Sequence, residues 1–120
     1  FRGRVEAVLH PLVLQRLVRS SGDLPAAVRV FLVEVPLLYE AGFPFERNLD
    51  IVVGASATRQ KSRLVNERGI PAVLAEKILD SQMPIEEKAK RADIVVWNDG
   101  SLDSFGAQTE HLARRFAPFC

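Results

Sequence analysis

The feature that most constrains this chain is an apolar run at residues 28–35, VRVFLVEV, which Pro36 ends. β-Branched and aromatic side chains follow one another there, as in a strand that is buried on both faces. The sequence therefore predicts a buried strand at 28–35. Ligands bind at the carboxyl ends of parallel strands in open α/β sheets, so Glu34, Tyr39 and Glu40 are candidates for a binding edge. The alternative is that Glu40 lies in solvent at a helix start and Tyr39 packs in the core.

Two further short apolar runs predict two more buried strands, at residues 50–54 (DIVVG) and 93–97 (DIVVW). Helical patterns separate the three runs, and no hairpin signal joins them. Strands connected in this way pair in parallel through right-handed crossovers. The predicted architecture is α/β, with a parallel sheet and a helical insertion at about residues 58–91.

Proline, glycine and serine mark the ends of the predicted helices. Pro11 interrupts an apolar helical face near the N-terminus, because proline has no N–H and restricts the residue before it. The sequence predicts a short helix that ends near Leu9 and a second that begins at Pro11. Ser56 is the predicted N-cap of a polar helix at about residues 57–68, which Gly69 ends.

Three more helices follow in the second half of the chain. Two of them are predicted to begin at Pro71 and Pro84. The helix after Pro84 has acidic residues in its first turn and basic residues in its last, which matches the helix dipole. Ser101 is the predicted N-cap of the final helix.

Composition and charge exclude several classes of protein. The 120 residues allow one domain at most, and a hydrophobic fraction of 48% is typical of a globular protein. A net charge of +1 argues against a broad nucleic-acid footprint. The single cysteine, Cys120, excludes an intramolecular disulfide, and no apolar run reaches the roughly 20 residues of a membrane span. We expect a cytoplasmic protein, and the opening at Phe1 rather than Met suggests truncation of a longer one.

Basic side chains concentrate in the predicted helix at 57–68, where Arg63 and Arg68 are two of four cations beside one acid. Arginine forms bidentate, charge-assisted bonds to phosphate, and a mobile helical pair can close over a transferring phosphoryl group. The alternative is a solvated helix without a ligand. His10, at the expected helix junction, would suit a phosphate or hydroxyl contact, or serve only as a cap or a packed ring.

Other chemistry-bearing patterns are missing from these 120 residues. There is no Cys/His cluster with zinc spacing and no nucleophile-elbow motif. There is also no GxxxxGK[ST] phosphate loop. A nucleotide enzyme built from this sequence alone would lack its phosphate cradle.

An ordered set of short motifs extends along most of the chain. It comprises His10-Pro11, Pro36-Leu37-Leu38 with Glu40, Asp50, Gln60 with Arg63 and Arg68, Ala75 with Ile78 and Gln82, Lys88, Ala92-Asp93, and Asn98 with Gly100. In this order and at about this spacing, over residues 5–116, the set resembles the dephospho-CoA kinases.

The resemblance implies a partial P-loop-kinase-like three-layer fold with a parallel sheet and a helical lid. Residues 1–120 would form a single partial kinase domain, with residues 58–91 as its lid region. The implied reaction transfers the γ-phosphoryl of ATP, with Mg²⁺, to the ribose 3′-hydroxyl of dephospho-CoA in the last step of coenzyme A biosynthesis. Dephospho-CoA is the implied partner, with no nucleic acid and no membrane.

The resemblance also assigns roles to particular residues but no metal ligand. Arg63 and Arg68 would be catalytic and would neutralise phosphate charge. The residues on the ATP side would be Asn98, Gly100 and Lys77. The residues on the substrate side would be His10, Leu37, Leu38 and Glu40.

Two departures from the family pattern shape the interpretation. Lys77 replaces a common lid arginine, which keeps the charge but loses the planar fork. The phosphate loop is absent, so the leading interpretation is the C-terminal portion of a dephospho-CoA kinase, inactive alone. The strand that carries this loop in the family is absent as well, and it would lie between the strands at 28–35 and 50–54. Its absence would expose the apolar edges of both strands, which favours a homo-oligomer or a rearrangement. The alternatives are a non-catalytic nucleotide-, CoA- or partner-binding remnant and a small α/β structural domain.

Overall fold

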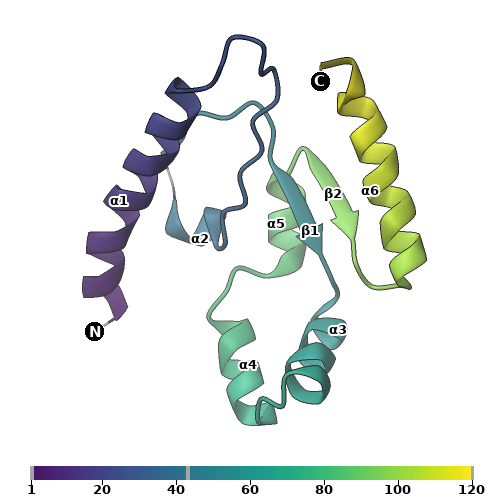
Figure 1. The fold of residues 1–120 in the computed structure, drawn as a ribbon. Helices are drawn as coiled ribbons and strands as arrows, with labels where there is room; N and C mark the ends of the chain where they lie inside the picture. The colour runs from purple at the N-terminus through teal and green to yellow at the C-terminus, as the bar shows by residue number, and fades with distance from the viewer. Residues whose placement is uncertain (1, 43, 120) are drawn as a thin grey trace. The chain divides into compact units, whose positions relative to one another are not determined.

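The computed structural model describes residues 2–42 and 44–119 of the chain (Figure 1). The chain divides into two compact units. One is Asn48–Arg115, and the other combines Phe1–Arg47 with Phe116–Cys120. Cys120, on which the expectation about disulfides rests, lies outside the described residues.

The Asn48–Arg115 unit contains a sheet of two parallel strands, β1 (Ile51–Gly54) and β2 (Ile94–Trp97). The strands pair from their first residues to their last, where Gly54 lies opposite Trp97. The strands predicted at these two places, and their parallel pairing, are confirmed. The predicted α/β fold class is confirmed as well.

Helices form the crossover between the two strands, as parallel pairing requires. They are α3 (Ala57–Ser62), a π-helical turn η1 (Arg63–Glu67), α4 (Ala72–Asp80) and α5 (Ile85–Arg91). After β2 the chain continues into α6 (Leu102–Phe116) and a short 3₁₀ turn, η2 (Ala117–Phe119). Pro71 and Pro84 are the N-caps of α4 and α5, so the helix starts predicted at these two prolines are confirmed.

The predicted capping residues also occupy their expected places. The hydroxyl oxygen of Ser56 accepts the Arg59 N–H at 3.3 Å, and that of Ser101 accepts the Ser104 N–H at 3.2 Å. Gly69 has a φ of 66°, the left-handed conformation that ends a helix at little cost to glycine. Local sequence signals therefore fix where these helices begin and end.

The core of this unit is built from small side chains. The side chains of Ala55, Ala75 and Val96 are 8%, 0% and 4% exposed. Gly54 ends β1 at a close approach, since a Cβ there would lie 3.1 Å from Cζ3 of Trp97. The absence of a side chain at Gly54 therefore lets the indole ring pack over the end of the strand.

A side-chain amide of α6 occupies the outer edge of β2. Oε1 of Gln108 accepts the Trp97 N–H at 3.0 Å, and its Nε2 donates to the Trp97 carbonyl at 2.9 Å. These are the two backbone groups that a further strand would bind. β1 has no strand on its other side among the described residues.

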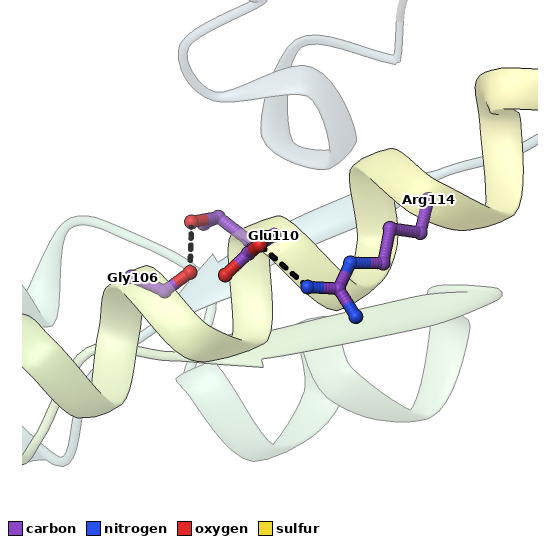
Figure 2. A network of polar contacts seen from close by, with 4 residues as sticks. Gly106, Glu110 and Arg114 are labelled. Carbon is purple, nitrogen blue, oxygen red and sulfur yellow. Dashed lines mark hydrogen bonds and ion pairs between the residues drawn. The ribbon is translucent and has the colours of Figure 1, made fainter.

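The outer face of α6 carries short-range polar contacts that support the helix. Nη2 of Arg114 pairs with Oε1 of Glu110 at 2.6 Å, and Oγ1 of Thr109 donates to the Gly106 carbonyl at 2.8 Å (Figure 2). The ion pair joins residues four apart and is exposed, so its contribution to stability is about 0.3–0.5 kcal/mol. It is a structural feature of the helix surface.

The other unit contains the helices α1 (Arg2–Gly22) and α2 (Leu38–Ala41). Helix α1 continues through Pro11, so the prediction of two helices separated at this proline was wrong. A proline inside a helix removes one backbone N–H and clashes with the carbonyl one turn earlier. In α1 the helix tolerates this lost hydrogen bond and continues to Gly22. No helix in the described part of the chain is long and apolar enough to cross a bilayer.

Residues 28–35 form no strand, and the prediction of a strand there was wrong. A strand is defined by hydrogen bonds to a neighbour, and the described strands β1 and β2 pair only with each other. No strand lies beside this run among the described residues, and Leu32 is 79% exposed.

Candidate functional site

The candidate site is the loop that follows β2, together with the start of the crossover after β1. The N–H of Asn98 donates to the Gly54 carbonyl at 2.7 Å, which extends the strand pairing by one residue. The loop Asn98-Asp99-Gly100 therefore begins at the carboxyl edge of the sheet, where ligands of α/β proteins bind.

Arg63 of η1 binds the first residue of this loop. Its Nη2 donates to the Asn98 backbone oxygen at 2.7 Å and to the Asn98 Oδ1 at 3.1 Å, in a partly buried setting. The structure thus brings together a predicted catalytic residue and a predicted ATP-side residue that are 35 positions apart. The Nε and Nη1 of Arg63 make no hydrogen bond within the described residues.

Arg59 binds the second residue of the loop, a contact that the sequence analysis missed. Its Nε and Nη2 both donate to the Asp99 carbonyl, at 3.1 Å and 2.7 Å. Arg59 and Arg63 are four residues apart and so lie on one helical face. That spacing is the signal that could have identified Arg59.

The carboxylate of Asp99 joins the same loop to the start of α3. Its Oδ1 accepts the backbone N–H of Ser56 at 2.7 Å and the Ser56 hydroxyl at 3.1 Å. The Nε2 of Gln60 holds the same turn from inside, donating to the Ala55 carbonyl at 2.6 Å. No sequence pattern pointed to Asp99, because it follows the motif residue Asn98 and its partner is 43 residues away.

Arg68 and Lys77, the other predicted cations of the site, have exposed side chains. Arg68 is the C-cap of η1, and Lys77 lies in the last turn of α4. Neither side chain has a hydrogen-bond or ion-pair partner among residues 2–42 and 44–119. Both therefore remain available to an anionic ligand.

An ion pair joins the first two helices of the predicted lid region. The Nζ of Lys61 on α3 lies 2.5 Å from Oε1 of Glu76 on α4. The two side chains are 45% and 56% exposed, so the pair adds at most about 1 kcal/mol.

The predicted substrate-side residues belong to the other compact unit. His10 lies within α1, so the prediction of a helix junction at His10 was wrong. Leu37, the N-cap of α2, has φ 58° and ψ 36°, a left-handed conformation that costs a non-glycine residue about 1–2 kcal/mol. Leu38 and Glu40 are partly buried within α2. Such strain persists where the surroundings enforce it, and it often marks a functional turn.

No group of three or more His, Cys, Asp or Glu side chains in the described ranges is arranged to hold a metal ion. The contacts described above join arginine donors to the backbone and side-chain oxygens of Asn98 and to the carbonyl of Asp99. Arginine donors suit an anionic ligand such as phosphate.

Comparison with known proteins finds one family over most of the chain. A family model described as dephospho-CoA kinase matches residues 2–104. The dephospho-CoA kinase of Symbiobacterium thermophilum is 38% identical over 110 residues, which cover 91% of this chain and 46% of that protein. The dephospho-CoA kinase of Syntrophotalea carbinolica is 33% identical over 115 residues, which cover 95% of this chain and 54% of that protein.

A solved structure is similar as well. The crystal structure of a Thermus thermophilus protein matches with a TM-score of 0.72 and 32% sequence identity, over 93% of this chain and 58% of that chain. The chain spans about half the length of the curated relatives that it matches.

Proposed function

The chain belongs to the dephospho-CoA kinase family, and from this premise we propose that it acts as the C-terminal portion of such a kinase. The whole protein would transfer the γ-phosphoryl of ATP to the ribose 3′-hydroxyl of dephospho-CoA. The observation that carries the proposal is the contact of Arg63 with Asn98, which fixes a lid arginine on the loop at the carboxyl edge of the sheet.

The N–H groups of Arg63 that do not bind Asn98 are the donors that could bind phosphate. Phosphoryl transfer depends on positioning and on neutralising charge. Arg63 uses one nitrogen for the loop, so Nε and Nη1 can donate to phosphate oxygens. Arg68 would add a second fork and Lys77 a point charge. Asn98 and Gly100 would lie on the adenine side of ATP.

Mg²⁺ in kinases is held by one or two carboxylates, water and the phosphates of the substrate. The described residues offer no cluster of three candidate ligands. Mg²⁺ would enter with the phosphates of ATP, and we name no residue of this chain as its ligand.

Dephospho-CoA would bind on the side that carries His10, Leu37, Leu38 and Glu40. The left-handed conformation of Leu37 supports this assignment, because strain at a residue other than glycine often occurs at functional sites. Residues 58–91 would form the lid, and residues 1–120 would be part of one kinase domain. A cytoplasmic location and the absence of nucleic-acid and membrane partners stay predictions.

A second candidate function is a non-catalytic remnant that binds a nucleotide, CoA or a protein partner. The observation in its favour is the edge of β1 that has no strand beside it in the described part of the chain. An unpaired strand edge can pair with a second copy, so this candidate includes a homo-oligomer. Sedimentation of the chain at several concentrations separates a monomer from such a dimer.

The test uses the protein made from the natural gene, after its intact mass has been determined. CoA formation from dephospho-CoA and ATP is measured for the unsubstituted protein, for Arg63→Ala and for Arg115→Ala. Removing one preorganised charged donor lowers kcat/KM about 100-fold or more. Arg115 is exposed on α6 and serves as the matched control. Failure to form CoA, or equal rates for both variants, would contradict the proposal, and ATP binding without turnover would favour the remnant.

A further inference from the structure

A carboxylate ties the loop after β2 to the turn after β1. Oδ1 of Asp99 accepts the N–H and the hydroxyl of Ser56, at 2.7 Å and 3.1 Å. Arg59 donates twice to the carbonyl oxygen of Asp99, at 3.1 Å and 2.7 Å. We call Ser56, Arg59 and Asp99 the Asp99 clasp.

The clasp does more than cap a helix. The hydroxyl oxygen of Ser56 already accepts the Arg59 N–H, which is the usual N-cap bond of α3. Asp99 adds a tertiary link between segments that are 43 residues apart. Four hydrogen bonds converge on this one residue, two on its carboxylate and two on its carbonyl.

The clasp also completes a pattern along the loop. Arg63 holds the carbonyl of Asn98, and Arg59 holds the carbonyl of Asp99. Two arginines on one helical face thus bind consecutive carbonyls. Together with the Asp99 carboxylate they fix the orientation of both peptide groups, and hence the direction of the Asn98 side chain.

We propose that Asp99 is a positioning residue that, through the clasp, holds the Asn98–Gly100 loop in the conformation that receives the nucleotide of ATP. This inference rests on the proposed function, because it takes this loop as the adenine side. Asp99 touches neither phosphate nor acceptor in this scheme. Its loss should therefore weaken ATP binding while leaving the chemical step nearly unchanged.

The expected kinetic signature is a rise in the KM for ATP. In the protein made from the natural gene, Asp99→Ala raises this KM about tenfold, equivalent to about 1.4 kcal/mol, with kcat changed less than about threefold. Asp99→Asn restores the KM to within about threefold of the unsubstituted value, because the amide oxygen still accepts from Ser56. Asp103→Ala is the matched control, since Asp103 is exposed in the first turn of α6, and it leaves the KM unchanged.

A second measurement separates positioning from loss of structure. If Asp99 only stabilised the unit, Asp99→Ala would lower the urea midpoint and the apparent kcat and leave the KM for ATP unchanged, and this result would overturn the inference. Should Asp99→Ala fail to fold, Ser56→Ala removes the hydroxyl bond to Asp99 together with the N-cap bond to Arg59, and keeps the backbone bond to Asp99. Its KM for ATP should rise by about threefold, and an unchanged KM would overturn the inference.

The outcomes also separate this inference from the proposed function. No CoA formation by the unsubstituted protein would overturn both. Normal CoA formation together with an unchanged KM for ATP in Asp99→Ala would overturn the inference alone.

Discussion

Replacing Arg63 by alanine should destabilise the Asn48–Arg115 unit more than the same change at Arg68, an exposed arginine without a partner among the described residues. The Nη2 of Arg63 donates to two oxygens of Asn98, at 2.7 Å and 3.1 Å, in a partly buried setting. A hydrogen bond from a charged group contributes about 1.5–3 kcal/mol. A single nitrogen of Arg63 donates to both oxygens, and in the variant water can bind part of Asn98 instead. We therefore expect the free energy of unfolding to fall by about 2 kcal/mol.

Urea unfolding followed by tryptophan fluorescence measures this loss. Trp97 is the only tryptophan of the chain and directly precedes Asn98, so its emission reports on the unit that contains the site. Arg68→Ala is the matched control, because its exposed side chain has no partner in the described part of the chain. Its free energy of unfolding should change by less than about 0.5 kcal/mol.

The comparison has a clear refuting result. If Arg63→Ala and Arg68→Ala unfold at the same urea concentration with equal slopes, then Arg63 does not bind the loop in solution. The assignment of Arg63 as the lid arginine held on the nucleotide loop would then lose its structural basis.

Three further predictions concern packing, the sheet edge and pH. Gly54→Ala places a Cβ 3.1 Å from the Trp97 ring and should lower the free energy of unfolding by about 1 kcal/mol in the same urea assay. Gln108→Glu can still accept the Trp97 N–H but cannot donate to its carbonyl, so it should cost more than Gln108→Ala, about 2 against 1 kcal/mol by thermal unfolding. The Lys90 ammonium lowers the pKa of Glu87 below 4.5, and Glu87 raises the pKa of Lys90 above 10.5. The stabilisation of α5 by this pair is therefore largest near neutral pH and falls as pH drops through the lowered Glu87 pKa or rises through the raised Lys90 pKa. The urea midpoints of Lys90→Met and the unsubstituted chain should differ more at pH 7 than at pH 3 or 11.5.

The helix ends of the Asn48–Arg115 unit could be predicted because their causes are local, and its two strands because each apolar run finds the other as its partner. An apolar run followed by glycine predicted β1, and a hydroxyl before the helix predicted the cap at Ser56. Gly69 ended its helix for the same kind of reason, its left-handed φ. The cap and glycine signals act within a few residues, whereas the run at β1 became a strand because β2 lies beside it.

The two failures have different causes. Residues 28–35 have the composition of a buried strand, but strand formation needs a neighbour that these residues do not find in the described chain. Pro11 removes one N–H from the helix, but the residues on both sides of it are helical, so α1 continues through the proline. Composition reports what a segment prefers, while pairing and continuity depend on what surrounds it.

The candidate site was predicted in part. The family motifs pointed to Arg63 and Asn98, and the structure brings these two residues into contact. Arg59 and Asp99 are not among the family motif residues, and their contacts join segments 40 and 43 residues apart. Tertiary hydrogen bonds of this kind become visible only when the loop and the helix are seen together.

The most direct test of the central claim is transfer of a labelled γ-phosphoryl group from ATP to dephospho-CoA by the protein made from the natural gene. We predict labelled CoA that carries the phosphate on the ribose 3′-oxygen, with the rate lost in Arg63→Ala and kept in Arg115→Ala. A protein that binds ATP but yields no labelled CoA, or one whose rate is the same in both variants, would contradict the account.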